Sequence, residues 1–154
     1  MKLSREDFWG LAFRFFLGGI FVLAGFSKLM EPVENFRGAI ADYQLLPYAL
    51  VPWVAQVFPW LELFFGFFML AGYLPRLTGA VLASFSSIFI LFLTASDKLL
   101  SGAGQNCGCF GQNGFIRLTV WQVALLDLAI LAAGIYLARR KSFPFSLDAW
   151  LRKS

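Results

Sequence analysis

Residues 77–95 read LTGAVLASFSSIFILFLTA and contain no charged side chain. At a rise of about 1.5 Å per residue, a helix over this stretch spans about 28 Å, close to the roughly 30 Å hydrocarbon core of a bilayer. Three further apolar stretches have a similar length, at about residues 8–29, 53–73 and 118–138. The sequence therefore predicts an all-α membrane protein, a single four-helix transmembrane bundle over residues 1–154.

The composition of the chain supports the same class. Hydrophobic residues make up 59% of it, charged residues only 14%, and the mean hydropathy is +0.70. A soluble domain carries about a quarter charged residues, so this chain lacks the side chains for a water-facing surface. The net charge of +4 is modest and its basic residues gather near helix ends. We therefore expect the lipid bilayer as a partner and no nucleic acid.

The distribution of Lys and Arg predicts the orientation of the chain. Cytoplasmic flanks of membrane helices carry an excess of these residues. On this rule both termini are cytoplasmic, and the loops 30–52 and 96–117 lie outside, in the periplasm of a bacterium. We expect a multi-pass protein of the cytoplasmic (inner) membrane. The residues that carry this argument are Lys2, Arg5, Arg76, Arg139, Arg140, Lys141, Arg152 and Lys153.

The first outer loop has a pattern of its own. Phe36, Ile40 and Tyr43 recur at helical spacing after Pro32, before Leu46-Pro47. Such spacing predicts a short amphipathic helix that lies on the membrane surface. Tyr43 is a candidate contact residue of this loop.

The second outer loop carries the strongest candidate for chemistry. Its glycine-rich sequence SGAGQNCGCFGQNG contains the two cysteines of the chain, Cys107 and Cys109, with Gly108 between them. A disulfide in so small a ring gains little chain-entropy stabilisation, whereas strained disulfides are reduced easily and are often catalytic. The pattern therefore favours a thiol–disulfide redox pair, with both cysteines as catalytic residues.

Other readings of the cysteine pair stay open. The two cysteines could be inert, or their thiolates could bind a soft metal such as copper(I). Zinc normally takes four ligands, and the chain has no histidine and no further cysteine to complete them. We expect no metal site. Gly108, Phe110 and Gly111 would shape the loop, and Arg117 or Lys98 could stabilise a thiolate.

Charged residues inside the predicted helices form a second candidate site. A charge at membrane depth is costly unless it is paired or hydrated, which makes it a functional hypothesis. Arg14 and Lys28 share a helix face with small residues, a pattern typical of a face that packs against another helix. Two readings remain: these charges only fix how the helices pack, or they line a polar pocket or proton route near the cysteine loop. The cluster consists of Arg14, Lys28, Glu62 and Asp127.

Three serines lie in the middle of the stretch 77–95, at Ser84, Ser86 and Ser87. Hydroxyl groups in a membrane helix usually donate to the helix backbone. We expect these three to do so and to have no further role.

These motifs together resemble the MauE/DoxX family of redox-associated membrane proteins, in particular its methylamine-utilisation MauE branch. The resemblance covers about residues 10–135, and the CGCFG element is its most specific part. The matching residues are Arg14, Gly18, Phe21, Ala24-Gly25, Lys28-Leu29, Phe36, Ala39-Ile40, Tyr43, Leu46-Pro47, Pro59, Glu62, Gly66, Cys107-Gly108-Cys109-Phe110-Gly111 and Arg117.

The resemblance implies a four-helix bundle with a role in periplasmic thiol–disulfide chemistry, often beside a thioredoxin-like partner. DoxX-side relatives are linked to quinone-coupled sulfur oxidation. With one cysteine pair on one face, electrons from Cys107 and Cys109 must pass to such a partner or to a membrane acceptor such as a quinone. We therefore predict a thiol–disulfide oxidoreductase component, with the charged cluster binding or protonating the acceptor.

Two other functions are compatible with the sequence. A non-catalytic assembly factor or chaperone for a periplasmic redox protein would keep its function without Cys107 and Cys109. A small-molecule or metal transporter would instead depend on Glu62. The direction of electron flow, the partner and the oligomeric state are not determined by the sequence.

Overall fold

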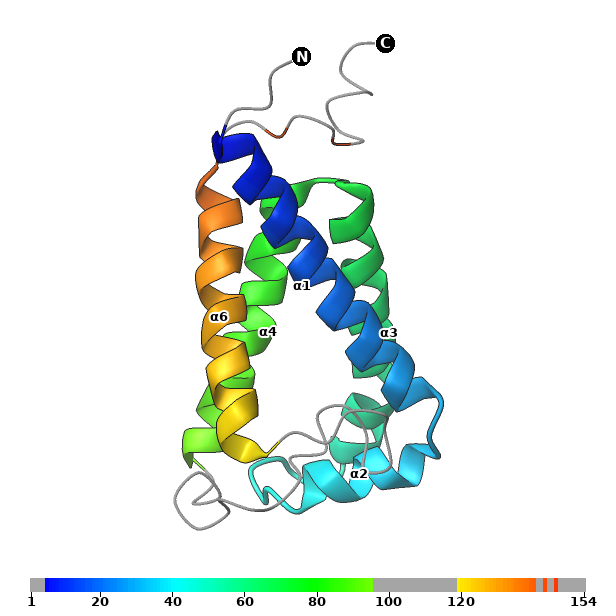
Figure 1. Cartoon of the computed structure of the whole chain (residues 1–154). Coiled ribbons are helices and arrows are strands. Elements are labelled where there is room, and N and C mark those ends of the chain that lie inside the picture. The colour runs from blue at the N-terminus through cyan, green and yellow to red at the C-terminus, as the bar shows by residue number, and fades with distance from the viewer. Residues whose placement is uncertain (1–4, 96–118, 141–142, 144–145, 147–154) are drawn as a thin grey trace.

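The computed structural model describes residues 5–95, 119–140, 143 and 146, and five helices make up the regular structure of these residues (Figure 1). Four are long: α1 (Arg5–Leu29), α3 (Val51–Ala71), α4 (Pro75–Ala95) and α6 (Val120–Arg139). Each is long and apolar enough to cross a membrane. The predicted fold class, an all-α membrane protein with four membrane-spanning helices, is confirmed. The fifth helix, α2 (Val33–Ala41), is short.

Proline and glycine set the ends of α3 and α4. Helix α3 begins at Val51, two residues before the predicted start, and carries Pro52 in its first turn. Proline is accepted there because the first N–H groups of a helix have no partner within it. Helix α3 ends at Ala71, earlier than predicted, because Gly72 takes a left-handed conformation with φ of 70°. Helix α4 then begins at Pro75.

The first and last of the long helices, α1 and α6, also begin a few residues from the predicted positions. Helix α1 begins at Arg5, where the apolar stretch had suggested a start near residue 8. Helix α6 begins at Val120 because Thr119 and Gln122 form a capping box at its start. The Thr119 backbone N–H donates to the Gln122 side-chain oxygen at 3.0 Å. This reciprocal bonding satisfies N–H groups that the first turn leaves without a partner.

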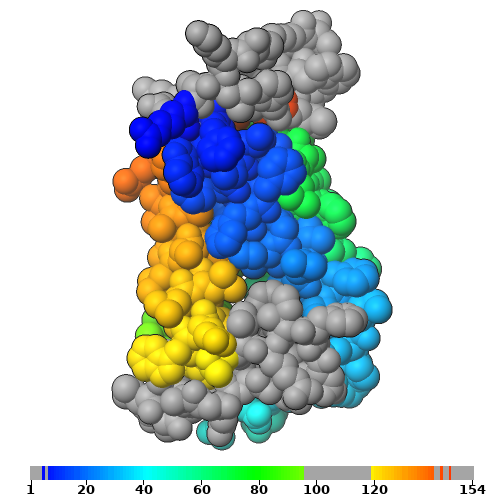
Figure 2. All heavy atoms as spheres, viewed as in Figure 1, coloured from blue at the N-terminus to red at the C-terminus, as the bar shows by residue number. Residues whose placement is uncertain are grey.

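The four long helices form two closely packed pairs, α1 with α3 and α4 with α6. Helix α1 crosses the bundle obliquely (Figure 1). It runs from beside α6, at the end where α1 begins and α6 ends (the terminal end), to beside α3 at the other end, where α2 lies. In the space-filling view, α1 adjoins α6 at the terminal end (Figure 2). The two pairs therefore meet at the terminal end and separate toward α2.

Glycines allow the helices of each pair to approach closely. A Cβ atom on Gly25 would lie 2.7 Å from the Pro59 carbonyl oxygen, and one on Gly66 would lie 2.9 Å from the Val22 backbone nitrogen. Between α4 and α6, a Cβ on Gly134 would lie 2.9 Å from the Gly79 carbonyl oxygen. Small residues are the usual means of close helix packing in membranes. The expected packing of the α1 glycine face against another helix is confirmed.

The core lies at the terminal end, where the pairs meet. Its buried residues come from all four long helices: Leu17, Phe21, Met69, Leu82, Ile130, Ala133 and Leu137. Large apolar side chains also cover the outside of the bundle, among them Phe15, Trp60, Leu91 and Leu125. An apolar exterior of this kind suits contact with lipid.

An ion pair joins the start of α1 to the residue after α6 at the terminal end. The Arg140 Nη2 atom, just after α6, lies 2.6 Å from the Asp7 Oδ1 atom in the first turns of α1. The Arg140 guanidinium also packs against Gly10, which has no side chain to occupy that space. The first and last membrane helices are thereby linked at one end of the molecule.

Candidate functional site

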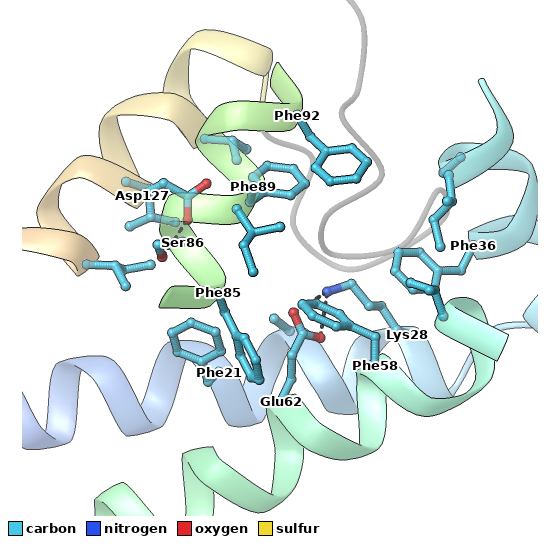
Figure 3. A pocket seen from close by; sticks show the side chains of 18 of the residues that line it. Phe21, Lys28, Phe36, Phe58, Glu62, Phe85, Ser86, Phe89, Phe92 and Asp127 are labelled. Atoms are coloured by element: carbon cyan, nitrogen blue, oxygen red, sulfur yellow. Dashed lines mark hydrogen bonds and ion pairs between the residues drawn. The ribbon is translucent and has the colours of Figure 1, made fainter. Parts of the chain in front are cut away.

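A cavity of about 160 Å³ lies in the half of the bundle nearest α2. Because α1 and α6 separate toward this end, all four long helices contribute to its walls, and α2 lies across it. Six phenylalanine rings from α1, α2, α3 and α4 line it: Phe21, Phe36, Phe58, Phe85, Phe89 and Phe92 (Figure 3). An engineered cavity of about 150 Å³ takes up benzene, so this space suits a ring-sized molecule.

The α1–α3 wall of the cavity carries a buried ion pair. Lys28 Nζ lies 2.7 Å and 2.6 Å from the two carboxylate oxygens of Glu62. The two residues are only 6% and 5% exposed. The ammonium group also faces the rings of Phe36 and Phe58, at 5.2 and 5.8 Å from their centroids. Ion pairing and cation–π contact together offset the cost of burying the Lys28 charge.

The α4–α6 wall carries a second polar pair. Ser86 Oγ donates a hydrogen bond of 3.0 Å to Asp127 Oδ1. Ser86 is 1% exposed and Asp127 is 9% exposed. In Figure 3 this pair lies across the cavity from Lys28 and Glu62, with phenylalanine rings between. Asp127 lines the same cavity as both members of the ion pair.

The expectation for Ser86 was wrong, whereas it was right for its neighbours. Ser84 and Ser87 donate to the backbone carbonyls of Ala80 and Ala83, each at 2.9 Å. Ser86 faces α6 and donates to Asp127 across the helix interface. The sequence did hold a signal, because a buried carboxyl on a facing helix needs a hydrogen-bond donor. Which of the three hydroxyls supplies it depends on how α4 and α6 pack.

Arg14 does not lie with the other three charged residues. Its Nε and Nη2 atoms donate to the carbonyl oxygens of Met69 and Leu70, at 3.1 and 2.9 Å, where α3 ends. Fourteen helical residues separate it from Lys28, about 21 Å along α1. Arg14 therefore adds donors to carbonyls in the last turn of α3, where the Met69 oxygen also accepts from the Gly72 backbone N–H. The structure divides the predicted cluster: Lys28, Glu62 and Asp127 line the cavity, and Arg14 does not.

The apolar face of α2 is turned toward the bundle. Phe36, Ala39 and Ile40 of α2, and Tyr43 after it, line the cavity. The expected short helix is present, and its apolar face covers the cavity end. Tyr43 also packs against a small buried cluster that includes Leu93 and Val120. Burial, and to a lesser degree the negative charge of Asp42, raises the pKa of Tyr43, so its phenol is neutral at physiological pH.

The predicted redox residues lie outside the described part of the chain. They are Cys107, Cys109, Gly108, Phe110, Gly111, Lys98 and Arg117. The described segments that flank them are α4, which ends at Ala95, and α6, which begins at Val120. Both of these helix ends lie at the α2 end of the bundle (Figure 1). Among the described residues, no three acidic side chains meet as a metal site would require.

Comparison with known proteins identifies the family. The family model described as "Methylamine utilisation protein MauE" matches residues 7–139, which include all four long helices and every charged residue of the cavity. The chain belongs to the MauE family.

Two curated MauE relatives support this assignment. The methylamine utilization protein MauE of Paracoccus denitrificans is 30% identical over 128 residues, which cover 82% of this chain and 67% of the relative. The protein of the same name from Methylophilus methylotrophus is 32% identical over 127 residues, which cover 80% of this chain and 64% of the relative. The chain thus spans about two thirds of the length of these relatives. No solved structure matches the chain.

Proposed function

We propose that this MauE-family protein is an accessory membrane protein of methylamine utilisation that works as a thiol–disulfide redox component. Cys107 and Cys109 form its reactive pair and exchange electrons with a thioredoxin-like protein, a membrane quinone, or both. The observation that carries the proposal is the Cys107-Gly108-Cys109 sequence, the chain's only thiols, in a protein that otherwise consists largely of membrane-spanning helices.

Chain connectivity supports a link between the cysteines and the cavity. The segment 96–118 joins the end of α4 to the start of α6, and both of these ends lie beside α2. The polar residues of the cavity belong to the same half of the bundle. A membrane acceptor in the cavity would therefore lie at the same end of the molecule as the two helix ends that the cysteine segment connects.

The chemistry proceeds through a mixed disulfide. One cysteine thiolate attacks a sulfur of the partner's disulfide, and the second cysteine resolves the bond, which leaves Cys107 and Cys109 oxidised and the partner reduced. The reverse sequence oxidises the partner. Lys98 and Arg117 would stabilise the attacking thiolate, and Gly108 and Gly111 would permit the turn that brings the sulfurs together. With all thiols on one face, a partner or quinone must complete the electron path.

The proposed location follows from the distribution of basic residues. Arg76 lies in the first turn of α4, at the end where α1 begins and α6 ends, and Arg139 and Arg140 lie at that same end. The positive-inside rule makes this end cytoplasmic. The cavity, α2 and the cysteine segment then face the periplasm from the inner membrane.

A redox titration of the purified protein tests the proposal. Thiols are trapped with a mass-tagged alkylating reagent after equilibration with glutathione buffers of graded potential, and are counted by mass. We expect a reversible two-thiol transition between roughly −100 and −250 mV, where catalytic dithiols lie. The double variant Cys107→Ser/Cys109→Ser, which has no thiol, is the control for labelling at other groups.

The result separates the proposal from a non-catalytic role. A pair that never titrates in this range would exclude working redox chemistry. Retained methylamine-dependent growth in cells that carry only the double serine variant would point to an assembly factor that needs no thiols.

A further inference from the structure

Acidic side chains outnumber basic ones among the described residues of the cavity. The described walls carry one cation, Lys28, and two acids, Glu62 and Asp127. Lys28 is bound to both oxygens of Glu62, so this pair is electrically neutral by itself. Among the described residues, Asp127 forms no ion pair, and its Oδ1 atom accepts a hydrogen bond of 3.0 Å from Ser86. An isolated ionised carboxylate at this depth is strongly unfavourable.

The simplest neutral state of the cavity has a proton on Asp127. With Oδ1 bonded to Ser86, the protonated oxygen Oδ2 offers an O–H donor on the α4–α6 wall. On the opposite wall, an ammonium group has three N–H donors, and Glu62 occupies two of those of Lys28. The cavity thus has one spare donor on each of two facing walls, with aromatic side chains between them (Figure 3).

We infer that this cavity binds the head group of a 1,4-quinone, with Lys28 and protonated Asp127 donating to its two opposed carbonyl oxygens. A quinone ring has the size of the cavity, and its flat faces suit the phenylalanine walls. Its two acceptors lie on opposite sides of the ring, as the two donors do in the cavity. The inference rests on the proposed function for the source of electrons, but the binding itself needs only described residues.

The arrangement also gives Asp127 a role in the redox step. Two electrons from the Cys107/Cys109 dithiol reduce the quinone to a hydroquinone, which needs two protons, while the dithiol becomes a disulfide and releases two. Asp127 gives a proton to the carbonyl oxygen that it contacts and regains one of the thiol protons through water. Water carries the other thiol proton to the second carbonyl oxygen, beside Lys28, so that the two protons released by the dithiol equal the two that the hydroquinone takes up.

Binding is measured first in the Cys107→Ser/Cys109→Ser background, where no electron transfer can occur. The probe is a short-tailed 1,4-benzoquinone, titrated by calorimetry into protein in detergent micelles. We expect saturable binding that Asp127→Asn changes by no more than about threefold, because a carboxamide keeps an N–H donor. Asp127→Leu, which has no donor, should weaken binding about tenfold or more. Asp7→Asn, an acid at the far end of the bundle, should have no effect.

Two binding results would overturn the inference. One is equal affinity in wild type, Asp127→Asn and Asp127→Leu, which would mean that Asp127 does not contact the ring. The other is saturable binding of benzylammonium that Asp127→Asn abolishes, which would make Asp127 an ionised carboxylate and the cavity a site for organic cations.

The rate of hydroquinone formation by the reduced wild-type cysteines tests the proton step. Asp127→Asn keeps the donor but cannot transfer a proton, so we expect about a 100-fold slower rate at nearly unchanged affinity, as for loss of a general acid. An unchanged rate would refute the role of Asp127. If the wild-type dithiol reduces no quinone although the binding pattern holds, the quinone branch of the proposed function and the proton step fail, while the binding site stands.

Discussion

At the scale of single residues, the ion pair between Lys28 and Glu62 dominates the energetics of the cavity. Each partner is almost fully buried, and each would be an uncompensated charge without the other. Removing one partner of a buried pair costs far more than replacing both, because the remaining charge keeps its desolvation cost. A test of stability can therefore distinguish the cost of an orphaned charge from the net contribution of the pair.

Lys28→Met should destabilise the protein by about 3–5 kcal/mol, because Glu62 is left buried without its cation. The double variant Lys28→Met/Glu62→Met should lie near wild type, since both desolvation costs are removed together. The free energy of unfolding in mixed micelles measures both.

Asp7→Asn serves as the matched control, because the Asp7–Arg140 pair is more exposed than the cavity pair. It should cost about 1 kcal/mol or less. A Lys28→Met variant as stable as Asp7→Asn would show that Glu62 is satisfied in some other way, by hydration or by taking up a proton.

At the scale of the elements, close contact between α1 and α3 brings Lys28 and Glu62 together. The glycines that allow this contact lie about one turn from the pair on each helix, Gly25 before Lys28 and Gly66 after Glu62. A wider separation of these helices would lengthen both hydrogen bonds of the pair. The polar wall of the cavity therefore depends on helix packing as much as on the charges themselves.

Gly25→Ala should destabilise the bundle by about 1–3 kcal/mol, because its Cβ would meet the backbone of α3 at Pro59 and Leu63. Gly19→Ala is the matched control on the same helix, since a Cβ there has nothing within 4 Å. It should be neutral or stabilise by up to about 1 kcal/mol through helix propensity. Equal destabilisation by both substitutions, measured by thermal unfolding in micelles, would contradict the close-packing argument.

At the scale of the whole molecule, the bundle has two chemically different ends. The terminal end contains the main core and the Asp7–Arg140 pair. The α2 end contains the cavity, and the helix ends that flank the cysteine segment lie there. If the protein works as proposed, each end faces a different compartment. The orientation in the membrane is then part of the mechanism.

In intact cells, a membrane-impermeant maleimide applied after a mild reductant should label Cys107 and Cys109, whereas a cysteine placed after Ser154 in the double serine variant should stay unlabelled. The positive-inside rule gives this direction. Labelling is read as a mass shift on a gel, and lysed cells, in which both positions react, are the control. The reverse pattern would put the cysteine segment in the cytoplasm and exclude a periplasmic partner.

The sequence by itself determined the class of this protein. Four uncharged or nearly uncharged stretches can satisfy their backbone groups in lipid only as helices, which requires no knowledge of their packing. Helix ends were predicted within a few residues, because apolar length does not reveal a capping box at Thr119 or a left-handed Gly72. The four intramembrane charges were also recognisable, since charge at that depth is costly wherever it lies.

Only the tertiary structure decided which of these residues act together. Arg14 and Lys28 lie on one helix face, yet the oblique crossing of α1 leaves the first at the end of α3 and the second in the cavity. Ser86 pairs with Asp127 because α4 and α6 turn these side chains toward each other, while Ser84 and Ser87 bond to their own helix. Sequence periodicity shows which residues share a face of one helix, whereas the packing of the neighbouring helix determines which side chains they contact.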